Sequence, residues 1–136
     1  HLIYVTYPLI KEAKFLLSIA EHITKAAELA LLALLTYERE YKRIDPFSKD
    51  FAVMIDVFHP EVQKRYDFGQ EYVVLLKKLA ELKQFSAESI MRFKRKDKYI
   101  LTTEQYDTHV LDLDKVKRLC VATKNFIERV EQIWTI

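Results

Sequence analysis

The chain has 136 residues, the length of one domain, and half of them are hydrophobic. It contains one glycine and three prolines. Strand turns, dinucleotide-binding loops and P-loops all need glycine, so this composition excludes an all-β fold, a Rossmann site and a P-loop. The 22 basic and 20 acidic side chains leave a net charge of +2, which predicts no overall attraction to nucleic acid or membranes. We therefore expect one helical domain over residues 1–136.

The first expected element is a long helix from about Leu9 to Arg43. This stretch contains no glycine or proline, and hydrophobic or aromatic residues recur at steps of three and four. These residues are Leu16, Ala20, Ile23, Ala27, Ala30, Leu34, Tyr37 and Tyr41. Because such a helix exceeds the usual length severalfold, a kink or break near Phe15 is an alternative. The hydrophobic opening HLIYVTYPLI has no capping residue before it, so we expect the natural N-terminus to lie upstream, or His1 to be a tag remnant.

Within this helix, Leu29–Leu35 is hydrophobic on every side. Such a segment has to be covered all round, either by a bundle of the same chain or by a second subunit. The second interpretation predicts a homodimer whose interface contains Leu29, Leu31, Leu32 and Leu35. The first interpretation, a helix at the centre of one bundle, stays equally open.

A proline ends the long helix. The residue before Pro46 is displaced from the α region, so we expect a break at Ile44–Phe47. Ser48 or Asp50 is expected to cap a short helix from Phe51 to about Phe58. Pro60 then opens a further turn that continues through Tyr66.

The second half of the chain starts at Gly69, which is expected to be a loop or helix-terminating residue. A third helix is expected from Gln70 to about Ile90. Two runs rich in β-branched and aromatic residues follow, Tyr99–Thr102 and Thr108–Leu111, and they predict a short hairpin or an ordered loop. The last helix comes after them, and its candidate caps are Asp112 and Asp114.

These elements predict an all-α fold: an up-and-down helical bundle with one very long N-terminal helix and a short β-hairpin or ordered loop before the last helix. The single cysteine, Cys120, excludes an internal disulfide and is expected to be a buried residue of the last helix. The longest hydrophobic run, Leu29–Leu35, is too short to span a bilayer. We expect no membrane association and a cytoplasmic location.

The sharpest local feature is a basic run before the expected hairpin. Five basic residues fall within seven positions, with aromatic residues between and beside them: Arg92, Phe93, Lys94, Arg95, Lys96, Lys98 and Tyr99. Such cations bind phosphates, and neighbouring aromatic rings stack on unpaired bases. We therefore expect an RNA- or nucleotide-phosphate site made of Arg92, Lys94, Arg95, Lys96, Lys98 and Tyr99, together with His109 from the expected hairpin. The alternative is a solvent-exposed turn whose charges are neutralised by nearby carboxylates, namely Glu104, Asp107, Asp112 and Asp114.

Catalytic and metal-binding patterns are weaker. His109, in the expected hairpin, is the one histidine within reach of the basic run and so the candidate general acid or base, although an exposed strand residue is the simpler interpretation. No second histidine or cysteine stands at zinc-like spacing from His22, so no metal and no cofactor is predicted. Glu38 and Lys42 form a favourable i,i+4 pair that predicts a solvent-exposed helix face.

The order of elements resembles that of the HEPN superfamily of small helical bundles. The resemblance covers most of the chain: a long helix with the motif AAELALLALL and the ending LALLALLTYEREYKRI, then shorter helices, a basic loop and a closing helix. It implies dimerisation through the long helices and activity either as a metal-independent ribonuclease or as a nucleotide-binding partner of a nucleotidyltransferase. Active ribonucleases of the family carry an arginine followed at short spacing by a histidine. No arginine here matches, since His109 lies 14 positions after Arg95, and no catalytic pair is carried over.

Three functional hypotheses follow. The first is a homodimeric, non-catalytic protein that binds RNA or a nucleotide phosphate through Arg92–Tyr99. The second is a protein-interaction module, antitoxin-like or a nucleotidyltransferase partner, that binds through its hydrophobic helix surface. The third is a metal-independent ribonuclease that uses Arg92 or Arg95 together with His109.

Overall fold

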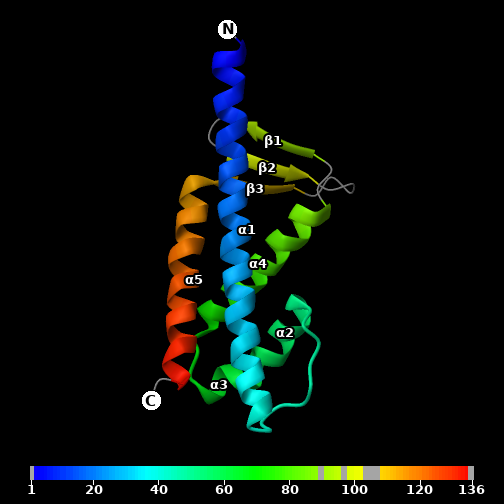
Figure 1. Cartoon of the computed structure of the whole chain (residues 1–136), viewed down its shortest axis with the longest axis vertical. Helices are drawn as coiled ribbons and strands as arrows, with labels where there is room; N and C mark the ends of the chain where they lie inside the picture. Colours follow the sequence, from blue (N-terminus) through cyan, green and yellow to red (C-terminus); the bar gives the residue numbers. More distant parts are fainter. Residues whose placement is uncertain (1, 89–90, 96–97, 103–107, 135–136) are drawn as a thin grey trace.

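The computed structural model describes residues 2–88, 91–95, 98–102 and 108–134, and it describes side chains for residues 15–84 and 112–134 (Figure 1). The elements in chain order are α1 (Leu2–Glu40), α2 (Phe51–Val57), a wide turn η1 (Phe58–Val62), α3 (Gln63–Arg65), α4 (Gln70–Glu88), β1 (Met91–Arg95), β2 (Lys98–Thr102), β3 (Thr108–Asp112) and α5 (Leu113–Trp134).

The long helix α1 is the spine of the molecule. It is continuous over 39 residues, about 58 Å at 1.5 Å per residue, and the alternative of a break near Phe15 is wrong. Figure 1 shows α5 beside it in the same direction, α4 returning in the opposite direction, and α2 and α3 at the end where α1 terminates. The predicted helical bundle with a very long N-terminal helix is confirmed.

Local signals explain where the middle elements begin and end. His59, which precedes Pro60, has extended backbone angles (φ −100°, ψ 130°), and its peptide bond to the proline is cis. The helical path therefore kinks between Phe58 and Pro60, as the sequence predicts. Gly69 lies in the loop before α4 as expected, but the left-handed conformation in this loop belongs to Asp67 (φ 55°).

The two predicted helix caps differ in outcome. The backbone N–H of Lys115 donates a 2.8 Å hydrogen bond to Oδ1 of Asp112, so Asp112 caps α5. Asp50 occupies the residue before α2, but its side chain makes no capping hydrogen bond.

The core is a single hydrophobic cluster that draws on α1, α2, η1, α4 and α5. Most of the predicted α1 stripe is buried, including Leu16, Ala27 and Leu34, whereas Tyr41 at its end is 60% exposed. The rings of Phe58, Phe68 and Phe126 pack edge-on or tilted at centroid distances of 5.2–6.2 Å. This aromatic contact joins the kinked segment, the loop before α4 and α5.

The predicted dimer residues on α1 divide into two groups. Leu31 and Leu35 have no exposed surface within one chain, so their burial needs no second subunit. Leu32 is partly buried against the same core, and Leu29 is 52% exposed. The bundle-centre interpretation therefore accounts for Leu31 and Leu35, and the dimer hypothesis now concerns Leu29 and Leu32.

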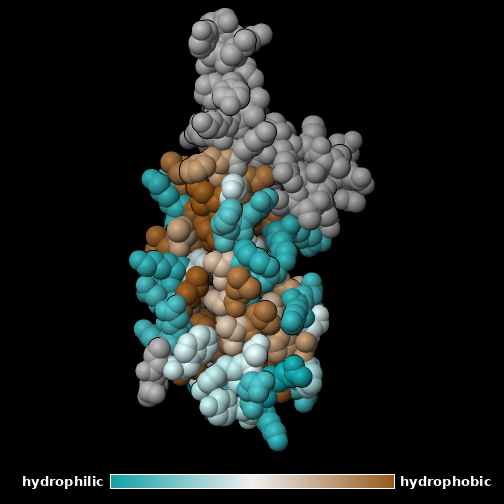
Figure 2. All heavy atoms as spheres, in the orientation of Figure 1, coloured by the Kyte–Doolittle hydropathy of each residue, from teal (hydrophilic) through white to brown (hydrophobic). Residues whose placement is uncertain are grey.

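The prediction for Cys120 is wrong, because this residue is exposed on α5. Its helix buries Val116, Leu119 and Thr123, and Cys120 lies at the exposed edge of this buried stripe. In Figure 2, hydrophilic residues follow the α5 edge, while hydrophobic residues gather where α5 begins beside α1. Among the helices that the structure describes, none is long and hydrophobic enough to cross a membrane.

A small antiparallel sheet precedes α5, with strand order β1-β2-β3. The predicted hairpin is confirmed, since β2 pairs with β3. The basic run adds a third strand, because Met91–Arg95 pairs with Lys98–Thr102 instead of forming a loop. Figure 1 places the sheet beside the upper half of α1, away from the end at which α5 terminates.

Replacing Leu31 by Ala should lower the free energy of unfolding by about 2–5 kcal/mol, because it removes a fully buried side chain and leaves a cavity. Leu29→Ala on the same helix should change it by less than about 0.5 kcal/mol in a monomer. Urea denaturation at two protein concentrations measures both variants. A large loss for Leu29→Ala that grows with protein concentration would instead show that a second copy covers this residue.

Candidate functional site

The predicted phosphate-binding residues that the structure describes lie on β1 and β2, with His109 on β3. The register sets Lys94 opposite Tyr99 and Arg95 opposite Lys98. Lys96, also predicted, falls outside the described residues. β1 is an edge strand of the described sheet, so Arg92, Lys94 and Arg95 lie along one edge of that sheet.

The register also divides these residues between the two faces of the sheet. Directly paired residues share a face, and neighbours along a strand alternate between faces. The row Arg92–Leu101–His109 and the row Lys94–Tyr99–Leu111 therefore belong to one face. The hydrophobic row Phe93–Ile100–Val110 and the row Arg95–Lys98–Asp112 belong to the other.

We call the first of these the basic face: Arg92, Lys94, Tyr99 and His109, together with Leu101 and Leu111. It contains no acidic position, whereas Asp112 stands opposite Lys98 on the other face. The structure thus brings four of the seven predicted site residues onto one surface. It assigns Arg95 and Lys98 to the other.

The register also decides which arginine is nearer to His109. Arg92 stands in the same cross-strand row as His109, two strand spacings away, or about 9.5 Å between backbones. Arg95 stands three rows further along the sheet. If an Arg–His pair forms here, it is therefore Arg92 and His109.

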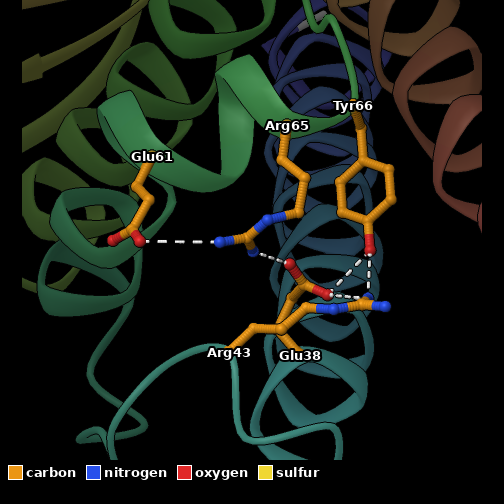
Figure 3. A network of polar contacts seen from close by, with 5 residues as sticks. All are labelled: Glu38, Arg43, Glu61, Arg65 and Tyr66. Atoms are coloured by element: carbon orange, nitrogen blue, oxygen red, sulfur yellow. Dashed lines mark hydrogen bonds and ion pairs between the residues drawn. The ribbon is translucent and has the colours of Figure 1, made fainter.

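A second cluster, which the sequence did not predict, surrounds Glu38 near the end of α1 (Figure 3). The expected exposed pair with Lys42 is wrong, because the Glu38 side chain has no exposed surface. Arg43 donates a 2.9 Å hydrogen bond to Oε2 of Glu38, and the Tyr66 hydroxyl donates one of 2.7 Å to the same oxygen. Arg65 donates to Oε1, so both carboxylate oxygens are satisfied.

The cluster extends beyond its central carboxylate. Arg43 also donates a 2.8 Å hydrogen bond to the Tyr66 hydroxyl oxygen, and Arg65 lies 3.5 Å from Glu61. On the α5 side, Arg129 donates a 2.8 Å hydrogen bond to the Tyr66 carbonyl. The polar groups of Glu38 therefore connect α1 with α3 and, through Tyr66, with α5.

Burial alone would raise the pKa of the Glu38 carboxyl. Hydrogen bonds from Tyr66, Arg43 and Arg65, together with the charge of Arg65, outweigh burial and hold that pKa below its ordinary value of 4.5. Burial, followed by the hydrogen bond to Glu38, raises the pKa of Tyr66 to about 12. Glu38 is thus ionised and Tyr66 protonated at neutral pH, which suits a structural ion cluster better than a proton-transfer site.

One signal in the sequence could have identified the buried position of Glu38. The residues three, four and seven positions before it, Leu35, Leu34 and Leu31, are all fully buried, and Glu38 continues their stripe. The i,i+4 relation to Lys42 pointed to solvent, because pair statistics on an isolated helix ignore what packs against it.

A hollow of about 590 Å³ adjoins this cluster between the loop after α1 and α2, and its lining includes Arg43, His59 and Glu61. The His59 imidazole Nδ1 lies 2.5 Å from the Gln63 amide oxygen. Across the described side chains, no three histidine, cysteine or carboxylate residues are grouped as a metal site would need.

Glu38→Gln should lower the free energy of unfolding at neutral pH by about 1.5–3 kcal/mol, the range for hydrogen bonds to a charged group. Arg43 and Arg65 are 38% and 29% exposed, so water can solvate them once the carboxylate is gone. The exposed neighbour in Glu40→Gln should have little effect.

The same variants test the pKa of Glu38. Since it is lowered in the folded state, the unfolded chain takes up the proton first, and the wild type should lose stability as the pH falls below 4.5. Urea midpoints measured from pH 7 to pH 3 should fall less steeply for Glu38→Gln than for the wild type and Glu40→Gln. Parallel curves for all three proteins would contradict the assignment.

No protein-family model matches this chain, and neither do the curated proteins or the solved structures with which it was compared. The HEPN resemblance therefore rests on the sequence features alone.

Proposed function

We propose that the protein binds the phosphate groups of RNA or a nucleotide through the basic face, as a homodimer and without catalysis. The observation that supports this proposal is the register that groups Arg92, Lys94, Tyr99 and His109 on one face of a paired sheet. Cations together with an aromatic ring on strands are the arrangement by which single-stranded nucleic acid is commonly bound.

The placement of the acidic residues favours this proposal over the alternative in which nearby carboxylates neutralise the basic residues of a solvent-exposed turn. Asp112 accepts the Lys115 N–H at the start of α5 and belongs to the face opposite the basic face. Asp114 lies in the first turn of α5, where a carboxylate interacts favourably with the helix dipole. Glu104 and Asp107 fall outside the described residues.

The homodimer part of the proposal rests on exposed hydrophobic residues of α1. Leu29 is 52% exposed, whereas Leu31, Leu34 and Leu35 on the same helix are fully buried, and Leu32 is only partly covered. A two-fold contact between α1 helices would cover these residues and double the number of basic faces in the assembly. Association with a different protein through the same residues is the alternative.

Fluorescence anisotropy of a labelled single-stranded RNA, at low and at physiological salt, tests the phosphate proposal. Each lost phosphate contact lowers the salt slope of a single-stranded complex by about 0.7. The double variant Arg92→Ala/Lys94→Ala should therefore bind more weakly, with a slope smaller by about 1.4.

The matched control, Arg95→Ala/Lys98→Ala, removes the same charge from the opposite face and should retain most of the affinity. Equal losses in the two variants would show a diffuse charge effect instead of a site. If the wild type does not bind RNA even at low salt, the proposal fails and association with a protein becomes the better explanation.

The ribonuclease hypothesis is tested on the same RNA. Because Arg92 and His109 share a cross-strand row, a metal-independent cleavage would use this pair. Cleavage in EDTA that disappears in both His109→Ala and Arg92→Ala, and persists in Arg95→Ala, would replace the non-catalytic proposal. Intact RNA after prolonged incubation is the result that we expect.

A further inference from the structure

At the end of the bundle away from the sheet, three aromatic rings form a row across two helices. Tyr37 lies at its centre, with ring centroids 4.9 Å from Tyr41 and 5.9 Å from Trp134. Tyr41 and Trp134 remain 60% and 39% exposed. We call Tyr41, Tyr37 and Trp134 the aromatic row.

The row includes a guanidinium that is held in place. The guanidinium carbon of Arg43 lies 5.1 Å from the Tyr41 ring centroid and 5.9 Å from that of Tyr37. Its hydrogen bonds to Glu38 and Tyr66 fix this position from the interior. Part of the surface is thus ordered before any ligand arrives, which lowers the entropy lost on binding.

The surroundings of the row fit a small planar ligand better than a protein partner. The residues that flank the row in sequence are exposed and polar or charged, namely Glu40 and Lys42 beside Tyr41, and Glu131 and Gln132 before Trp134. A stable protein interface covers about 800 Å² per partner around a hydrophobic centre, whereas the residues that flank the row are polar or charged. Figure 2 likewise shows mainly pale and hydrophilic side chains where α1 and α5 end.

Positive charge lies beside the row. Arg43 is against the Tyr37 and Tyr41 rings, and Lys42, which follows Tyr41 in sequence, is exposed and forms no ion pair with any residue whose side chain is described. A nucleotide carries a planar base beside a phosphate, so rings with adjacent cations match both of its parts.

We infer that the aromatic row is a stacking site for an unpaired nucleobase, from single-stranded RNA or from a free nucleotide. This site is independent of the basic face, which lies beside the other half of α1 (Figure 1). It involves no chemical step, only the stacking of a base on the exposed rings.

Trp134 is the only tryptophan in the chain, so its fluorescence reports on this site directly. We expect oligouridine to quench it with saturation, and an abasic oligomer of equal length to leave it unchanged. Uridine monophosphate, titrated separately, distinguishes the two sources: quenching at similar concentration indicates a free nucleotide, and quenching by the oligomer alone indicates RNA.

Tyr41→Ala should weaken the apparent affinity about 5- to 150-fold, the usual effect of losing one stacking ring, while Tyr41→Phe should preserve it. The matched control is Phe15→Ala, which removes a different exposed ring, on α1, that is 65% exposed. Quenching should persist in Arg92→Ala/Lys94→Ala, so a failure of the basic-face proposal can be distinguished from a failure here.

Three results would overturn the inference. The first is no quenching by either uridine probe. The second is equal quenching by the abasic oligomer, which would assign the effect to phosphate alone. The third is a Trp134 emission that changes only with protein concentration, because a second copy would then cover the row.

Discussion

The hydrogen-bonded carboxylate of Glu38 holds together the end of the bundle at which α1, α3 and α5 meet. A buried carboxylate costs several kcal/mol unless its oxygens are paired, and removing one partner costs more than the pair contributes. Here both oxygens are satisfied by groups that follow α1 in sequence: Arg43 in the loop, and Arg65 and Tyr66 around the end of α3. The carbonyl oxygen of Tyr66 in turn accepts a hydrogen bond from Arg129 of α5. The Glu38 carboxylate is therefore linked through Tyr66 to α5 as well as to α3.

This cluster also shapes the surface beside it. Arg43 uses its donors on Glu38 and Tyr66, so its guanidinium lies over Tyr37 and Tyr41 instead of extending into solvent. A buried ion pair thereby orders an exposed aromatic surface. The stability of the bundle and the geometry of the proposed stacking site consequently share one origin.

The two proposed binding surfaces differ in the structural elements that position their residues. The basic face depends on strand pairing, in which a slip of one residue would move Arg92 and Lys94 to the other side of the sheet. The aromatic row depends on the ends of two helices that run in the same direction (Figure 1). The continuous α1 helix runs from one surface to the other (Figure 1). The two surfaces are thus suited to binding separate groups, and neither needs the other to form.

The sequence by itself determined the elements whose signals are local. The spacing of hydrophobic residues predicted α1, α4 and α5, Pro46 and Pro60 predicted the breaks, and Asp112 predicted the start of α5. It also predicted the β2–β3 hairpin correctly. Only the tertiary structure decided that Met91–Arg95 is a strand, that Leu31 and Leu35 are covered by their own chain, and that Glu38 is buried. Each of these depends on residues distant in sequence, because pairing register, burial and ion-pair partners are properties of contacts that no local pattern specifies.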